Sequence, residues 1–156
     1  MGRAGENGVV LLVEDDDAHA VLIRHSFEER RADTIVRHVS DGGEALDYLF
    51  HRGRYEAIAA NPRPDLILID LRLPKTDGFE VLEQVKQSEE LQGIPVVVLS
   101  VSASVGDMRR AYRAHANSYL VKPVEEGRFR SMIGDLGFYW LGWNRHSMAP
   151  APAGRG

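Results

Sequence analysis

One residue type and several sequence patterns are missing from this sequence of 156 residues, and each absence excludes a class of protein. The chain has no cysteine, which excludes a disulfide framework, a zinc site with cysteine ligands and a thiol nucleophile. No apolar run approaches the roughly 18 residues of a membrane span, and residues 1–8 lack the apolar stretch of a signal peptide. The formal net charge of −4 argues against nucleic-acid binding through bulk electrostatics. We therefore expect a cytoplasmic protein that binds neither nucleic acid nor membrane.

Short apolar runs alternate with amphipathic segments along the chain. Five runs have the length and composition of strands: Val9–Val13, Thr34–Val39, Leu66–Ile69, Ile94–Leu99 and Tyr119–Val121. The strongest of them lack polar alternation, which indicates strands buried on both faces. The segments between them carry apolar residues at helical spacing. Five strands alternating with five helices predict an α/β fold, a doubly wound parallel sheet with helices on both faces.

The limits of the domain follow from composition. Residues 8–145 are expected to form it, whereas residues 1–7 and residues 146–156, which are rich in Pro, Gly and Ala, are expected to be disordered. One helix is expected to open at Gly42–Gly43 and to continue through the Ala-rich stretch Tyr55–Ala60, until the proline-rich stretch that follows stops it.

Four of the predicted strands end in polar residues. Glu14 and Asp15 follow the first strand, and Asp70 follows the third. Ser100 ends the fourth strand, and Lys122 follows the fifth. Taken alone, each residue has an ordinary interpretation, such as a solvated helix start or a cap. Because the carboxyl ends of parallel strands meet at one edge of a sheet, we expect these side chains to lie together.

The chemistry of this edge indicates a cation and a phosphoryl group. Two carboxylates ~4 Å apart repel by on the order of 4 kcal/mol at an effective dielectric of 20, so a cluster of three calls for a cation. Oxygen ligands without His or Cys select Mg²⁺ or Mn²⁺. With Lys122 and Ser100 opposite, a carboxylate could act as a nucleophile and become an acyl phosphate. The edge therefore predicts metal-dependent phosphoryl transfer.

The stretches that carry these groups resemble the receiver domains of two-component response regulators, which have the CheY-like fold. The matching stretches are Leu11–Asp15, Asp65–Pro74 with Asp77–Gly78, Pro95–Ser100 and Ser118–Pro123. The resemblance spans roughly residues 8–143 and implies the strand order 2-1-3-4-5.

The resemblance also implies a role for each polar group. Asp70 would accept phosphate from a histidine kinase, and Lys122 would sense it. Asp15 would bind Mg²⁺ (or Mn²⁺) directly and Glu14 mainly through water, and the backbone carbonyl of Arg72 would complete the protein ligands. Such a protein is not a metabolic enzyme, but it catalyses its own phosphorylation and dephosphorylation.

Signalling would depend on a switch pair, Ser100 and Tyr119. Phosphorylation would draw Ser100 inward and let Tyr119 turn in, which would alter the face made by the fourth helix, the fifth strand and the last helix. The resemblance further implies a cis peptide bond between Lys122 and Pro123.

A narrower resemblance concerns the partner. The long segment Ala45–Pro64, the stretch Ala116–Val124 and the aromatic last helix look like small regulators paired with phytochrome-type histidine kinases. A kinase of this type is therefore the expected partner.

The last helix is expected to run from about Val124 to Trp143. Helical geometry places one stripe against the sheet: Phe129, Ile133, Leu136, Trp140 and Trp143. Phe138 and Leu141 fall away from it. Either a glycine kinks the helix and both fold back onto the domain, or, as we prefer, they form an exposed patch beside Met108 and Tyr112 that binds a second copy of the chain.

Other functions stay open as alternatives. A receiver-like domain that is not phosphorylated could act as a protein-interaction module. An Asp-nucleophile phosphatase is disfavoured, because Asp70-Leu71-Arg72 lacks the second acid that this class needs. The glycine motifs of nucleotide-binding domains are absent. We expect no output domain after the last helix, and therefore output through binding, phosphate relay or assembly. The six histidines show no ligand spacing and are expected at the surface or at element edges.

Overall fold

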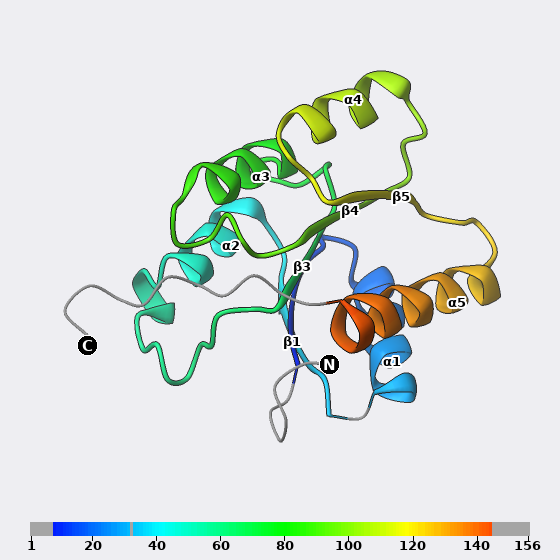
Figure 1. Ribbon diagram of the computed structural model, residues 1–156, viewed down its shortest axis with the longest axis horizontal. Coiled ribbons are helices and arrows are strands. Elements are labelled where there is room, and N and C mark those ends of the chain that lie inside the picture. The colour runs from blue at the N-terminus through cyan, green and yellow to red at the C-terminus, as the bar shows by residue number, and fades with distance from the viewer. Residues whose placement is uncertain (1–7, 32, 145–156) are drawn as a thin grey trace.

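The computed structural model describes residues 8–31 and 33–144. Within these ranges one sheet of parallel strands has the order β2-β1-β3-β4-β5 (Figure 1), which confirms the predicted fold and strand order. The strands are β1 (Val9–Val13), β2 (Ile35–Val39), β3 (Leu66–Ile69), β4 (Val96–Ser100) and β5 (Ser118–Val121). The predicted disorder of residues 1–7 and 146–156 lies outside the described residues.

Helices cover both faces of the sheet. On one face α1 and α5 lie side by side, and α2, α3 and α4 cover the other (Figure 1). The α-helices are α1 (Asp17–Arg30), α2 (Gly42–Leu49), α3 (Gly78–Gln87), α4 (Val105–Arg113) and α5 (Glu126–Gly137). Along β1, Val10 and Leu12 pack beneath α1 and α5, whereas Leu11 and Val13 pack on the opposite side. Burial of both faces explains the unbroken apolar runs. No helix in the described ranges is long and apolar enough to cross a membrane.

Polar caps set where four helices begin. The side chains of Asp16, Asp41, Asp77 and Ser104 each accept a backbone N–H from the residue three positions later. Such a cap contributes about 1 kcal/mol. Each cap closes a loop at the carboxyl edge of the sheet, so the caps also hold the loops that carry the polar groups.

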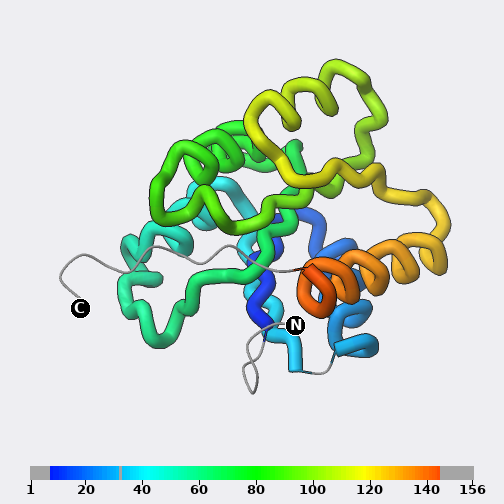
Figure 2. Tube along the Cα trace, viewed as in Figure 1, coloured from blue at the N-terminus to red at the C-terminus, as the bar shows by residue number. Residues whose placement is uncertain are grey.

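The helix predicted to extend to residue 60 is shorter. It ends at Leu49, and the chain continues through a 3-10 turn, η1 (Gly53–Tyr55), into a long loop at the lower left of Figure 2. The prediction is wrong because His51 and Gly53 have φ values of 53° and 57°, which no right-handed helix can continue through. The Tyr48 hydroxyl, which donates to the Pro62 carbonyl at 2.7 Å, then holds the loop against α2.

The last helix changes pitch after Gly137. It continues as a π-helical segment, η2 (Phe138–Trp143), in which the Asn144 N–H donates to the carbonyl of Tyr139 at 2.6 Å. A π-turn holds more residues than an α-turn, so the helical period expected from the sequence fails beyond Gly137. Leu141 is consequently buried and Trp143 is 69% exposed, the reverse of the prediction. The predicted burial of Phe129, Ile133 and Leu136, which lie within α5, is confirmed.

Candidate functional site

The carboxylates lie at the carboxyl edge of the sheet. Glu14 and Asp15 follow β1 and Asp70 follows β3, and carboxylate oxygens of the three side chains lie within 4.8 Å of one another. Glu14 and Asp70 are buried, whereas Asp15 is exposed. The donor set consists of carboxylate oxygens, with neither sulfur nor nitrogen. It fits a hard divalent cation such as Mg²⁺ or Mn²⁺.

Lys122 extends from the end of β5 into this cluster. Its Nζ donates to Glu14 Oε1 at 2.6 Å and to Asp70 Oδ2 at 2.9 Å, and its side chain is almost fully buried. The other oxygen of Asp70, Oδ1, accepts the backbone N–H of Arg72 at 3.0 Å. Both oxygens of Asp70 therefore have a fixed orientation, and one of them faces a buried ammonium group.

Burial and charge shift the pKa values of this pair. Burial raises the pKa of Glu14 from 4.5 to about 7, helped by the negative charge of Asp70 and opposed by the hydrogen bond and the charge of Lys122. Burial lowers the pKa of Lys122, but its hydrogen bonds and ion pairs with Glu14 and Asp70 outweigh this effect and raise it. Burial therefore disfavours the ionised form of Glu14 even with Lys122 beside it. A bound cation would stabilise the ionised carboxylates of the cluster.

The predicted switch residues meet at one loop. Ser100 is fully buried, and its Oγ accepts the backbone N–H of Ser102 at 3.1 Å. The Tyr119 hydroxyl donates to the backbone carbonyl of Ser102 at 2.9 Å, and the Tyr119 N–H donates to the Tyr112 hydroxyl at 3.1 Å. Ser102 also donates to Asp107 of α4 at 2.7 Å. Sequence reasoning missed Ser102, which connects the two switch residues to α4.

His19 is a second residue that sequence reasoning missed. Its Nδ1 lies 3.1 Å from Lys122 Nζ, at the rim of the carboxylate cluster. The side chain is 34% exposed and stands in the first turn of α1, which agrees with the expected position at the surface or at an element edge, but its contact with Lys122 was not expected. Its spacing from Asp15, one helical turn along the chain, is the signal that could have placed it at this edge.

Two further expectations are wrong. The peptide bond between Lys122 and Pro123 is trans, since none of the described peptide bonds is cis. Leu141 is 4% exposed and packs beside Gly8, so it is not available to a partner. Tyr112 and Phe138 are about half exposed and Met108 is half-buried, so these three side chains keep surface on the predicted face.

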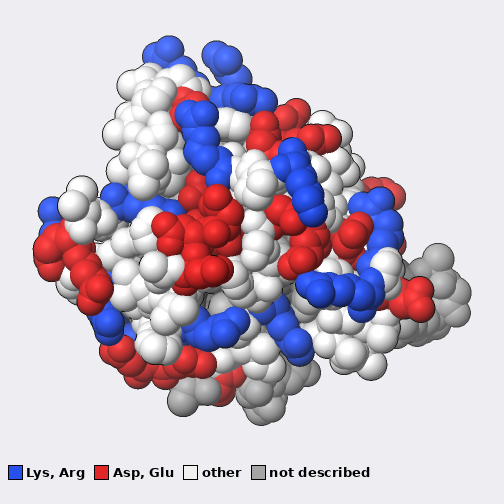
Figure 3. Space-filling model, turned by 180° about the vertical axis from the view of Figure 1, so that it is seen from behind, with Lys and Arg blue, Asp and Glu red and all other residues white. Residues whose placement is uncertain are grey.

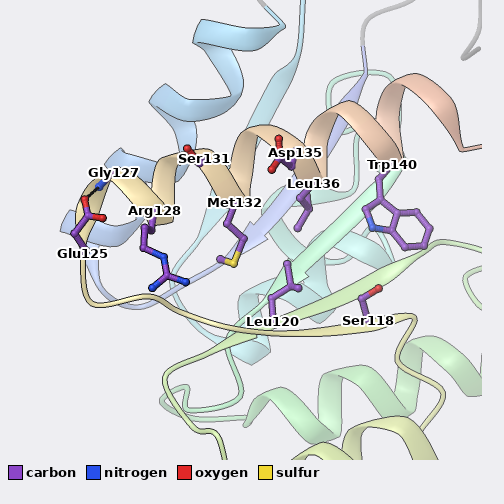
Figure 4. A pocket seen from close by; sticks show the side chains of 10 residues that line it. All are labelled: Ser118, Leu120, Glu125, Gly127, Arg128, Ser131, Met132, Asp135, Leu136 and Trp140. Atoms are coloured by element: carbon purple, nitrogen blue, oxygen red, sulfur yellow. Dashed lines mark hydrogen bonds between the residues drawn. The ribbon is translucent and has the colours of Figure 1, made fainter.

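A groove of about 610 Å³ lies between β5 and α5 (Figure 4). Leu120 of β5 and Met132 of α5 point toward each other across it, and Trp140 closes one end. Glu125 and Arg128 lie at the other end. The groove is separate from the carboxylate cluster and lies on the face predicted to change with phosphorylation.

Comparisons with known proteins agree with this geometry. Residues 10–134 match the family model described as the response regulator receiver domain. The chain is 47% identical over 146 residues to the probable methanogenesis regulatory protein FilR2 of Methanothrix harundinacea. The aligned residues cover 93% of this chain and 89% of that protein. It is 39% identical to the response regulator Rcp1 of a Synechocystis strain, over 85% of this chain and 88% of that protein.

Two solved structures share the fold and the narrower resemblance. The phosphorylated cyanobacterial phytochrome response regulator RcpA has a TM-score of 0.86 at 37% identity, covering 91% of this chain and 99% of that chain. The Mn²⁺-bound form of Rcp1 has a TM-score of 0.82 at 38% identity, covering 92% and 99% respectively. The resemblance to phytochrome response regulators is thereby confirmed. With its acidic cluster, its buried lysine and a family match over most of its length, this chain belongs to the response regulator receiver domain family.

Proposed function

We propose that this protein is the phosphoacceptor of a two-component signalling system, in which Asp70 receives a phosphoryl group from a histidine kinase in a reaction that depends on Mg²⁺ or Mn²⁺. The observation that carries the proposal is the contact of the Lys122 ammonium with Asp70 inside a cluster of three carboxylates. A buried cation beside an oriented carboxylate is suited to the charge of an incoming phosphoryl group.

Each residue of the site has its own role in the proposed reaction. An oxygen of Asp70 attacks the phosphorus of a phosphohistidine, a phosphorus–oxygen bond forms, and the phosphorus–nitrogen bond breaks with its electron pair going to the histidine nitrogen. Lys122 then donates to an oxygen of the transferred group. Glu14, Asp15 and Asp70, with the backbone carbonyl of Arg72 that the family resemblance implies, would hold the divalent ion, which supplies neutralisation of the phosphoryl oxygens.

The output passes through Ser102. If Ser100 turns its hydroxyl toward the phosphoryl group, it gives up the Ser102 N–H that it accepts at 3.1 Å. The Ser102 carbonyl accepts from the Tyr119 hydroxyl, and the Ser102 hydroxyl donates to Asp107 of α4. A shift of the loop that carries Ser102 would therefore affect β5 and α4 together. A change of a few kcal/mol is enough to shift the population of such an element.

The partners follow from the resemblance and from the surface. Relatives named as phytochrome response regulators support a phytochrome-type histidine kinase as the donor. The exposed Tyr112 and Phe138 and the groove beside β5 support a homodimer through the α4-β5-α5 face. On the face seen in Figure 3, Lys and Arg side chains are interspersed with Asp and Glu. A partner other than nucleic acid fits this mixture better.

The proposal is tested by phosphorylation with acetyl phosphate, followed by intact-protein mass. Wild type should take up one phosphoryl group in Mg²⁺ and none in EDTA, and Asp70→Asn should take up none in either. Asp47→Asn, an exposed aspartate of α2, is the matched control and should behave as wild type. A wild type that stays unmodified in Mg²⁺ would favour the alternative, a receiver-like domain that acts only by binding proteins.

A further inference from the structure

His19 touches the phosphoacceptor site but has no part in the function as proposed so far. It lies in the first turn of α1, where Asp16 accepts its backbone N–H at 3.1 Å. Side chains in a helix tilt toward its N-terminus, which aims the His19 ring at the site. The ring of Phe129 packs beside it, with the ring centroids 5.7 Å apart. His19 is therefore held from two sides.

The contacts of Lys122 define what His19 does. An ammonium group has three N–H donors and no acceptor. Here the three acceptors are Glu14 Oε1 at 2.6 Å, Asp70 Oδ2 at 2.9 Å and His19 Nδ1 at 3.1 Å. Because the ammonium can only donate, this hydrogen bond requires Nδ1 to accept, which it does in the tautomer that carries its proton on Nε2. His19 thus completes the hydrogen bonding of Lys122.

His19 differs from the other two acceptors in its chemistry. Glu14 and Asp70 are carboxylates of the predicted cation site, and Asp70 is itself changed when it becomes an acyl phosphate. His19 offers a ring nitrogen and belongs to a helix whose own cap and packing hold it in place. It can therefore keep its hydrogen bond to Lys122 while the carboxylates change partners.

We propose that His19 is a positioning residue for phosphoryl transfer, which holds the ammonium of Lys122 at Asp70 through Nδ1. The inference rests on the proposed function, in which Lys122 neutralises the phosphoryl oxygens. Without this acceptor the buried ammonium has one unsatisfied donor and is held at two points instead of three, so fewer molecules present it correctly to the incoming group. Loss of one hydrogen bond to a charged group predicts phosphorylation about tenfold slower.

Three variants separate the hydrogen bond from mere packing. His19→Leu keeps apolar contact with Phe129 but removes the acceptor, whereas His19→Asn restores an acceptor oxygen near the position of Nδ1. His25→Leu makes the same replacement at an exposed histidine of α1 and is the matched control. Thermal unfolding followed by circular dichroism checks that each variant folds.

Two measurements are made on each variant. In the metal-free protein, the proton–nitrogen correlation spectrum of the lysine ammonium groups should show Lys122 as a protected signal in wild type, in His19→Asn and in His25→Leu, and this signal should be lost in His19→Leu. With acetyl phosphate and Mg²⁺, His19→Leu should be phosphorylated about tenfold more slowly than wild type, and His19→Asn should recover most of the rate.

The outcomes are separable. Equal rates in wild type and His19→Leu overturn the inference, and so do equally slow rates in His19→Leu and His19→Asn, because the acceptor atom would then not be what matters. A wild type that takes up no phosphoryl group contradicts the proposed function and removes the rate claim with it. In that case a Lys122 signal unchanged in His19→Leu shows separately that His19 does not hold the ammonium.

Discussion

Replacing Glu14 with glutamine should change how the stability of the metal-free protein depends on pH. Burial raises the pKa of this carboxyl from 4.5 to about 7, so between these values the folded protein keeps a proton that the unfolded chain has released. The stabilising contribution of the protonated carboxyl is complete below pH 4.5 and is lost as the pH rises through about 7. The difference between the two pKa values corresponds to about 3 kcal/mol.

Glutamine imitates the protonated carboxyl at every pH and keeps an oxygen that can accept from Lys122. The free energy of unfolding of Glu14→Gln, minus that of wild type, should therefore rise by about 3 kcal/mol between pH 4 and pH 8. Urea unfolding in EDTA, followed by circular dichroism, measures it. Glu83→Gln, an exposed glutamate of α3, is the control. Parallel pH profiles for wild type and Glu14→Gln, or a difference that falls with pH, would refute the reasoning.

Three other predictions concern packing, assembly and switching. Gly137→Ala places a Cβ 2.8 Å from the buried ring of Phe27, so urea unfolding should show that the free energy of unfolding falls by about 1–3 kcal/mol. The control Gly106→Ala, whose Cβ has no contact under 3.5 Å, should not destabilise the protein. Equal stabilities of the two variants would contradict the close approach at Gly137. Phe138→Ser should weaken self-association in sedimentation velocity, and a wild type that stays monomeric at tens of micromolar, with and without beryllofluoride, would exclude the dimer. Ser100→Ala should still accept phosphate while beryllofluoride no longer changes its association, and unchanged coupling would remove Ser100 from the switch.

The fold and the position of the site were predictable because both depend on the strands. Strands buried on both faces read as unbroken apolar runs, and the first polar residue after each run lies at the carboxyl edge of the sheet. Glu14, Asp70 and Lys122 each stand at such a point, so their juxtaposition followed from the order of the elements. To place these residues together it was enough to predict that each follows a parallel strand at the carboxyl edge of the sheet. The directions of their side chains did not have to be predicted.

Contacts between loops were not predictable in the same way. Ser102 joins Ser100 to Tyr119 through backbone atoms, and such contacts leave no pattern in residue types. The spacing of His19 from Asp15 could have placed it at this edge, but its contact with Lys122 depends on side-chain positions that the spacing of residues does not define.

The prediction for the end of the last helix failed for a physical reason. Helical periodicity assumes a constant number of residues per turn, but the chain widens into a π-helical segment after Gly137. At that residue α5 comes so close to Phe27 of α1 that a Cβ would overlap the ring. The close approach of the two helices and the change of pitch thus occur at the same residue, and beyond it Leu141 lies inside in place of Trp143.

The most direct test of the account is to locate the phosphoryl group. Wild type is incubated with acetyl phosphate and Mg²⁺, the acyl phosphate is reduced with borohydride, and peptide mass spectrometry identifies the aspartate converted to homoserine. The geometry of Lys122 and the three carboxylates predicts conversion at Asp70, and none in a sample treated with EDTA. Conversion at another aspartate, or at the same level without the divalent ion, would contradict the assignment of Asp70 as the metal-dependent phosphoacceptor.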